Sequence, residues 1–234
     1  MFNGRLKAIT FSYDDGVTQD QRLIEILNKY ELKCTFNINS GKLGQSGSLL
    51  REDVTVAHVK PRKEEIARIY KGHEIAAHTL THPALNTLSD EDIIKEVEYD
   101  RLALSEHAGY EVVGMAYPFG THATDERVVS LIKNHTGIKY ARTTTSTHNF
   151  DLQNELIMFN PTVYHHGEWD EMFRLGQQFI DLNPQRPQIF YIWGHAYEFD
   201  IHNDWAKFEE FCKLISGRKD IFYGTNKEVL LNTL

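Results

Sequence analysis

Two adjacent carboxylates, Asp14 and Asp15, end a strand-like apolar run in the segment TFSYDDG at residues 10–16. Neighbouring side chains of a regular strand point to opposite faces, so both acids serve one site only if the chain turns beneath them. Gly16 permits such a turn, because glycine adopts backbone conformations that are closed to most other residues. The pair therefore predicts chemistry at the C-terminal end of this strand.

Two histidines four residues apart, His78 and His82, follow another strand-like run at residues 74–77. On a helical turn this spacing aims both imidazoles in one direction, so that both can bind one ion. A lone His-x-x-x-His is more often a helix cap or a core hydrogen bond, and the acidic pair on another strand favours the metal interpretation. Two imidazoles and one carboxylate leave coordination positions open for water and substrate, as a hydrolytic metal site requires.

The elements that must position these groups alternate along the chain, which predicts repeated β-α units around a parallel sheet. Strands are expected at residues 8–13, 33–38, 74–77, 112–116, 139–142, 156–163, 188–193 and 221–223, and helices at 19–30, 63–70, 90–107, 125–134, 168–182, 204–216 and 227–231. The expected fold is α/β, a distorted TIM-like (β/α) barrel of seven or eight parallel strands, with its site at the C-terminal strand ends. Residues 39–62 are too long for a routine connector and are expected to form a loop bordering that site.

Composition limits the classes of function. The 234 residues are 41% hydrophobic, which is enough for one sizeable core, so residues 1–234 are expected to form a single catalytic domain. A net charge of -8 without any basic run argues against nucleic acid or an anionic membrane as partner. Cys34 and Cys212 are interpreted as buried thiols in a reducing compartment. With no apolar leader or span in view, a cytoplasmic location is expected.

The chain resembles the polysaccharide deacetylases of carbohydrate esterase family 4, which share a NodB-like deacetylase domain. The first motif of that family, Thr-Phe-Asp-Asp-Gly, matches residues 11–16, and its second, His-Ser/Thr-x-x-His, matches residues 78–82. The resemblance implies that Asp14 is the catalytic base and that Asp15, His78 and His82 bind one divalent metal ion. Zinc is the first expectation, with cobalt, nickel or iron as alternatives, because this ligand set suits all four.

The third family motif, Arg-x-Pro-Tyr/Phe, falls on residues 116–120, where the arginine is replaced by Ala116. In relatives this arginine steadies the catalytic base, so we expect Arg142, at the end of the next strand, to take its place. A structural ion pair is the alternative role for Arg142. Tyr117 is expected to contact substrate, and the backbone N–H of Phe119 is expected to bind the oxyanion, since a backbone donor does not depend on the side chain.

The last two family motifs match unequally. The fourth, an acidic segment that orients a histidine, has no clear counterpart, and the Trp-Asp pair at residues 169–170 matches it only weakly. The fifth matches IFYIWGH at residues 189–195. The resemblance thus implies that His195 is the general acid, with Glu198 or Asp200 as candidates to orient it. His165 and His166 show no metal spacing and are expected to be structural or surface residues. Among aromatic residues that can stack on a sugar, Trp193, Tyr197, Trp169 and Trp205, we expect Tyr197 to face the ligand.

The function that this pattern implies is metal-dependent hydrolysis of the acetyl amide of an N-acetylated sugar, polysaccharide or small amide. One alternative is hydrolysis of another non-peptide C–N bond, as in a cyclic amide of the allantoinase or imidase type. A second is an iron oxygenase built on the same two histidines and one carboxylate. The third is a carbohydrate-binding relative without catalysis, which the missing arginine and fourth motif favour in part.

Overall fold

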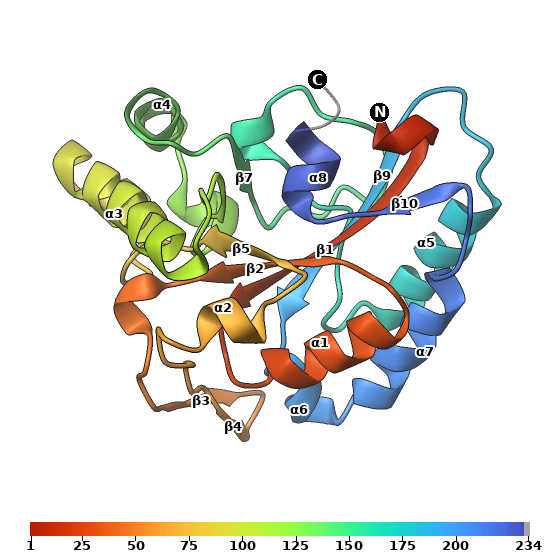
Figure 1. Cartoon of the computed structure of the whole chain (residues 1–234), viewed down its shortest axis with the longest axis horizontal. Helices are drawn as coiled ribbons and strands as arrows, with labels where there is room; N and C mark the ends of the chain where they lie inside the picture. The colour runs from red at the N-terminus through yellow and green to blue at the C-terminus, as the bar shows by residue number, and fades with distance from the viewer. Residues whose placement is uncertain (232–234) are drawn as a thin grey trace.

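A curled parallel β-sheet forms the centre of the chain in this computed structural model, which describes residues 1–231 (Figure 1). Its strands are β1 (Lys7–Asp15), β2 (Cys34–Ile38), β5 (Glu74–Ala77), β6 (Gly114–Ala116), β7 (Tyr140–Arg142), β8 (Val163–Tyr164), β9 (Gln188–His195) and β10 (Ile221–Tyr223). The order across the sheet is β7-β6-β5-β2-β1-β9-β8, and β10 pairs with the first residues of β1. All strand pairs of this sheet are parallel, as predicted.

Strand β1 pairs with β2, β9 and β10 and is buried along its whole length. Its large apolar residues alternate with smaller and polar ones, in the strand period, and both sets are buried, so both faces of the strand are covered. The register places Asp14 of β1 beside Asn37 of β2 on one side and beside His195 of β9 on the other. Three polar side chains from three strands therefore meet at one end of the sheet.

The sheet curls toward a barrel, and the segment at residues 159–164 connects its two edges, β7 and β9. The Phe159 N–H donates to the Ala141 carbonyl of β7, and farther along the segment β8 pairs with β9. The expectation of one strand over residues 156–163 is wrong: a 3-10 helix occupies Leu156–Met158, and β8 begins only at Val163. Pro161 explains the break, because proline has no N–H to give to a strand ladder. The distorted (β/α) barrel predicted from the sequence is otherwise confirmed.

The helices lie outside the sheet, with α1, α5 and α7 grouped at the right of Figure 1 and α3 and α4 at the left. They are α1 (Asp20–Lys29), α2 (Ile66–Ile69), α3 (Asp90–Ala108), α4 (Glu126–His135), α5 (Trp169–Asp181), α6 (Glu198–His202), α7 (Trp205–Ile215) and α8 (Asn226–Leu230). Local capping explains the ends of the longest of them, α3. The Ser89 side chain accepts the Asp92 N–H at the start of α3, and Gly109 ends that helix in the left-handed conformation. Of the helices described, none is long and apolar enough to cross a membrane.

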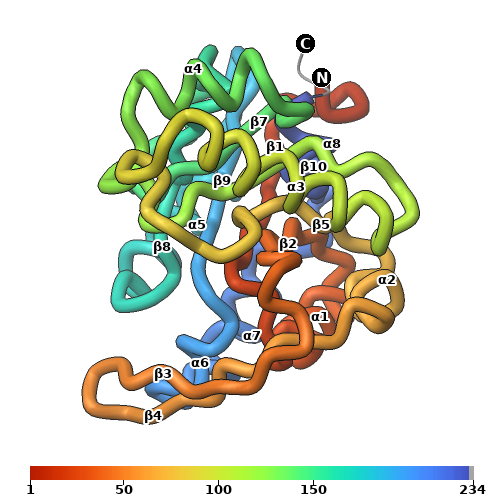
Figure 2. Tube along the Cα trace, turned by 90° about the vertical axis from the view of Figure 1, so that its left-hand side faces the viewer, coloured from red at the N-terminus to blue at the C-terminus, as the bar shows by residue number. Residues whose placement is uncertain are grey.

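A β-hairpin occupies the middle of the segment that the sequence analysis expected to be an irregular loop. Strands β3 (Ser48–Arg51) and β4 (Val54–Ala57) pair antiparallel and project from the body of the molecule beside α6 (Figure 2). The short helix α6 was also missed, because five residues are too few to show a helical period. The hairpin and α6 both border the C-terminal end of the sheet, where the polar side chains meet.

Candidate active site

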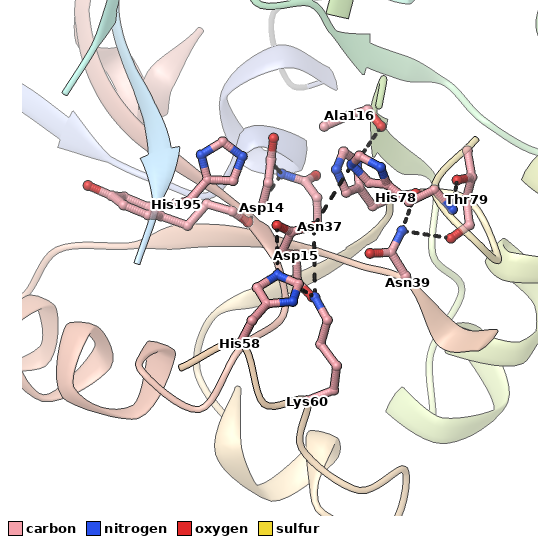
Figure 3. Close-up of polar contacts among 12 residues, drawn as sticks. Asp14, Asp15, Asn37, Asn39, His58, Lys60, His78, Thr79, Ala116 and His195 are labelled. Atoms are coloured by element: carbon pink, nitrogen blue, oxygen red, sulfur yellow. Dashed lines mark hydrogen bonds and ion pairs between the residues drawn. The ribbon is translucent and has the colours of Figure 1, made fainter. Parts of the chain in front are cut away.

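The two adjacent acids reach one site because the backbone turns directly beneath them. Asp15 has a φ of 80° and Gly16 a φ of 58°, so two successive residues leave the extended conformation of β1. A Cβ on Gly16 would also lie 3.0 Å from the Ile38 side chain. The turn that the sequence analysis required beneath the acidic pair is therefore present, and both carboxylates lie in the cavity described below (Figure 3).

Asp14 is a buried carboxylate with two hydrogen-bond donors. Asn37 Nδ2 donates to its Oδ1 over 2.8 Å, and the guanidinium Nη2 of Arg142 donates to its Oδ2. Burial alone would raise the pKa of Asp14, but the charge of Arg142, helped by nearby histidines, brings that pKa below its ordinary value. Arg142 is itself fully buried, with its guanidinium carbon 4.4 Å from the ring centre of Trp193. Asp14 is therefore an ionised group whose orientation is held from two sides.

Asp15 has different neighbours, which the sequence analysis did not name. His58 Nε2 donates to Asp15 Oδ2 over 3.1 Å, while Lys60 Nζ donates to the Asp15 carbonyl oxygen and lies 3.8 Å from Oδ1 (Figure 3). Burial opposes ionisation of Asp15, yet the hydrogen bond from His58 and the charge of Lys60 hold its pKa well below the usual range. Both residues follow β4, so the segment containing the hairpin supplies part of the site.

The rings of His78 and His82 meet edge to face, with their centres 4.8 Å apart and their planes inclined by 72°. The segment between them is a loop rather than the helical turn considered from the sequence, with left-handed backbone at Thr79 (φ 66°) and His82 (φ 64°). The Asn39 amide explains the loop, because it donates to the carbonyl oxygens of His78 and Thr79 and so replaces helical hydrogen bonds. The spacing of the two histidines still brings them together, by a different local structure.

Asp15, His78 and His82 each offer a ligand atom, and these atoms all lie within 4.8 Å of one another. The His78 Nδ1–H donates to the Ala116 carbonyl oxygen over 2.8 Å, which leaves Nε2 of that ring as a free lone pair. A backbone carbonyl on the second ring nitrogen is the usual way in which proteins orient a metal-binding histidine. Burial lowers the pKa of His82 to about 3, so its ring is neutral as a ligand must be. The three residues therefore fit a divalent metal ion.

His195 ends β9 and is held by Glu198, at the start of α6. The ring Nδ1–H donates to Glu198 Oε1 over 3.0 Å, and the His195 backbone N–H donates to Oε2 over the same distance. Tyr164 adds a third hydrogen bond by donating its hydroxyl to Oε1. Burial alone would lower the pKa of His195, but the charge of Glu198 raises it to about 9. His195 is therefore a cationic imidazole near neutral pH, and its Nε2 takes no part in the Glu198 contact.

These groups share one cavity of about 610 Å³ at the C-terminal end of the sheet. The lining residues are Asp14, Asp15, Lys42, Leu49, Arg51, Glu52, His58, His78, His82, Tyr117, Phe119, Thr144, Tyr164, His166, Trp193, His195, Tyr197, Glu198 and Ile201. Phe119 is 55% exposed, and its ring centre lies 4.8 Å from that of His82. Tyr117 is buried and donates its hydroxyl to the Ile157 carbonyl oxygen over 2.9 Å. Tyr197 lies between His58 and His195, 5.5 and 5.1 Å from their ring centres.

Other residues singled out from the sequence lie away from the cavity. Trp169 and Trp205 are buried outside the cavity lining and donate their indole N–H groups to Asp204 and Asp200. Asp200 thus contacts a tryptophan rather than His195, so of the two acids considered only Glu198 lies against the imidazole. His165 is buried, as expected of a structural residue, with its ring centre 4.4 Å from that of Phe199.

Comparison with known proteins adds the family. The model of the polysaccharide deacetylase family matches residues 3–141, more than half of the 234 residues. Chitin deacetylase 1 of Cryptococcus neoformans is 27% identical over 118 residues, which are 50% of this chain and 22% of that protein. The peptidoglycan-N-acetylglucosamine deacetylase PgdA of Listeria monocytogenes is 21% identical over 116 residues, 49% of this chain and 22% of that protein.

The fold comparison agrees with this match over nearly the whole chain. A family 4 acetyl xylan esterase from Clostridium thermocellum, solved in complex with a cobalt ion, superposes with a TM-score of 0.58 at 15% identity, covering 97% of this chain and 91% of that one. The two curated relatives are matched over only about a fifth of their own length. The family match begins before β1 and includes Asp14, Asp15, His78 and His82. The chain therefore belongs to the polysaccharide deacetylase family.

Proposed function

We propose that this protein is a divalent-metal-dependent deacetylase that hydrolyses the acetyl amide of N-acetylated sugars. One observation carries the proposal: the Asp15-His78-His82 cluster shares a single cavity with an ionised Asp14 and a cationic His195. A metal ligand set beside a base and an acid is the arrangement that amide hydrolysis requires. The two relatives named for chitin and peptidoglycan deacetylation support the choice of an N-acetylated sugar.

The metal site is assigned to Asp15, His78 and His82. A divalent ion bound there supplies Lewis-acid chemistry, which polarises a carbonyl group and makes water more acidic near neutral pH. Zinc is the proposed ion, because two imidazoles and one carboxylate form a common catalytic zinc ligand set. His58 and Lys60 assist by keeping Asp15 ionised and by fixing its orientation through the contacts to its carboxylate and carbonyl oxygen.

Asp14 is the proposed general base, which takes the proton from the attacking water. Arg142 and Asn37 keep its carboxylate ionised and aimed, so Arg142 takes the place of the family arginine that is missing at Ala116. His195 is the proposed general acid and protonates the departing amine, which is a poor leaving group without that proton. Glu198 keeps His195 protonated and oriented. The Phe119 N–H is the proposed donor to the oxyanion of the tetrahedral intermediate.

The hairpin favours a short substrate or the end of a longer one. Leu49, Arg51 and Glu52 of this hairpin line the cavity and form a wall on one side of it. A long polysaccharide would need an open groove at this position. Trp193, Tyr197 and the exposed Phe119 are among the aromatic residues of the cavity lining, and an aromatic ring offers a sugar an apolar face. We therefore propose an N-acetylated monosaccharide or short oligosaccharide as substrate, with Tyr117 supporting the floor of the cavity.

A substrate screen tests this function. N-acetylated sugars, their oligomers, a polymer and cyclic amides are incubated with the enzyme, with and without a chelator, and acetate and free amine are measured. We expect acetate and amine in equal amounts from short N-acetylated sugars, and loss of both with the chelator. Removing a positioned acid or base costs about 10²–10⁴ in rate, so Asp14→Asn and His195→Ala should be nearly inactive. Turnover of cyclic amides without acetate release would instead favour the alternative C–N hydrolase.

A further inference from the structure

A second cluster of metal-ligand side chains lies at the edge of the cavity, in Glu52, His166 and His202. Glu52 Oε1 is 2.7 Å from His166 Nε2, and Glu52 Oε2 is 2.9 Å from His202 Nε2. The two imidazole rings stack, with centres 5.6 Å apart and planes inclined by 12°. All three ligand atoms lie within 4.8 Å of one another, as do those of Asp15, His78 and His82.

The three residues come from segments far apart in the sequence. Glu52 lies in the two-residue turn of the β3–β4 hairpin, His166 follows β8, and His202 is the last residue of α6. The side chains of Glu52 and His202 are about half exposed, at 53% and 50%, whereas that of His166 is 14% exposed. An ion bound here would therefore join three separate segments and keep open positions for water.

The hairpin packs only thinly on the rest of the molecule, with Leu49 and Val54 partly buried against the core. No residue of β3 is buried, and only Val56 of β4 is. An isolated two-stranded hairpin is marginally stable in water, and segments with few buried apolar contacts open with a small free-energy cost. Contacts at the tip therefore decide how often this wall of the cavity opens. The contacts of Glu52 to His166 and His202 lie at this tip, so they control the opening.

We propose that Glu52, His166 and His202 form a second divalent-metal site, which fastens the hairpin over the cavity. The ligand class is a borderline transition ion such as zinc, nickel or cobalt, because two imidazoles disfavour magnesium and calcium. Zinc ligands stand about 2.0–2.2 Å from the ion, which puts tetrahedral donors about 3.3 Å apart. The present N···O separations are those of hydrogen bonds, so binding needs the three side chains to part by about half an ångström, which the half-exposed Glu52 and His202 can provide.

Metal stoichiometry tests the site directly and independently of deacetylation. The untagged chain is dialysed against zinc at about pH 7.5, and zinc per chain is measured by elemental analysis. We expect two equivalents for the wild type, one for His202→Ala and one for Asp15→Asn, which removes only the first site. The matched control is His148→Ala: His148 also contacts a glutamate, Glu168, over 3.1 Å, but it has no second imidazole and should retain two equivalents.

A protease measurement tests the fastening. Arg51, next to Glu52, is exposed, so trypsin cleavage after Arg51 reports opening of the hairpin tip. In the Asp15→Asn background, zinc should slow this cleavage several-fold, and His202→Ala should abolish the protection while His148→Ala preserves it. His166 also lies near His165 and Glu198, but that grouping does not include His202. Two equivalents of zinc in His202→Ala, or equal zinc protection with and without His202, would overturn the proposal.

Discussion

Replacing Glu198 with glutamine removes the charge that keeps His195 protonated and preserves the size of the side chain. In the wild type the pKa of His195 is raised from 6.5 to about 9, with the Glu198 carboxylate opposing the effect of burial. A general acid must carry its proton, so activity is present below this pKa and is lost as the pH rises through it. Glu198→Gln should therefore move the basic limb of the rate profile from near pH 9 toward 6.5.

The size of this effect follows from the same two values. At about pH 8 an imidazole of pKa about 9 is about nine-tenths protonated, whereas one of pKa 6.5 is about 3% protonated. A return of the His195 pKa to 6.5 would lower the rate at that pH by about thirty-fold. Burial acts to enlarge this fall, whereas the charges of Asp15 and Asp14 act to reduce it. Below about pH 6 the variant should approach the wild-type rate, since both imidazoles are then mostly protonated.

The assay is a profile of kcat between about pH 5.5 and 10 on a soluble N-acetylated sugar, with acetate as readout. Asp200→Asn is the control, because Asp200 lies in the same helix but accepts from Trp205 Nε1 over 2.8 Å and not from His195. Its profile should match the wild type. A Glu198→Gln profile with an unmoved basic limb, or a uniform loss at every pH, would refute the role of Glu198 in the protonation of His195.

Two further predictions concern stability. Arg142→Met leaves the Asp14 carboxylate buried without its charged partner, which should lower the free energy of unfolding by about 3–5 kcal/mol at neutral pH. The deficit should shrink as the pH falls and Asp14 takes up a proton, so an equal deficit at pH 5 and 7.5 in urea unfolding would contradict this. Gly194→Ala places a Cβ 1.9 Å from Nδ1 of the buried His165 and should cost about 1–3 kcal/mol, whereas Gly47→Ala, whose Cβ would lie 3.5 Å from its nearest neighbour, should leave the thermal midpoint nearly unchanged.

The sheet and most helices were predictable because their patterns are local. In β1 large apolar residues alternate with smaller and polar ones, which is the period of a strand. Helix α3 has a cap at Ser89 and a stop at Gly109. The groups that end strands, Asp14 and Arg142 among them, meet because the C-terminal ends of parallel strands lie at one edge. The contact between Arg142 and Asp14, 128 residues apart in the chain, needed only the order of β1 and β7 around a curled sheet.

The rest of the site depends on segments without a clear period. The hairpin lies inside a stretch whose length and glycines predict a loop. His58 and Lys60, which contact Asp15, follow this hairpin and belong to no sequence motif that would mark them as site residues. Asn37 was hidden within a strand, although a polar residue in a buried run marks a site that needs a partner. Glu198 and Asp200 were indistinguishable from the sequence, and only the start of α6 at Glu198 turns the first of them onto His195.

Metal titration of the deacetylase activity tests the central claim most directly. The metal-free chain is given zinc in fractions of an equivalent, and acetate release from an N-acetylated sugar is followed beside the bound zinc. The titration is done in the His202→Ala background, which keeps only the first site. Catalysis at Asp15, His78 and His82 predicts that activity then rises with the first equivalent and stays level. In the same background His78→Ala should neither retain this equivalent nor turn over, and Asp14→Asn should bind it but remain nearly inactive. Full acetate release by the metal-free chain, or by Asp14→Asn, would contradict the account.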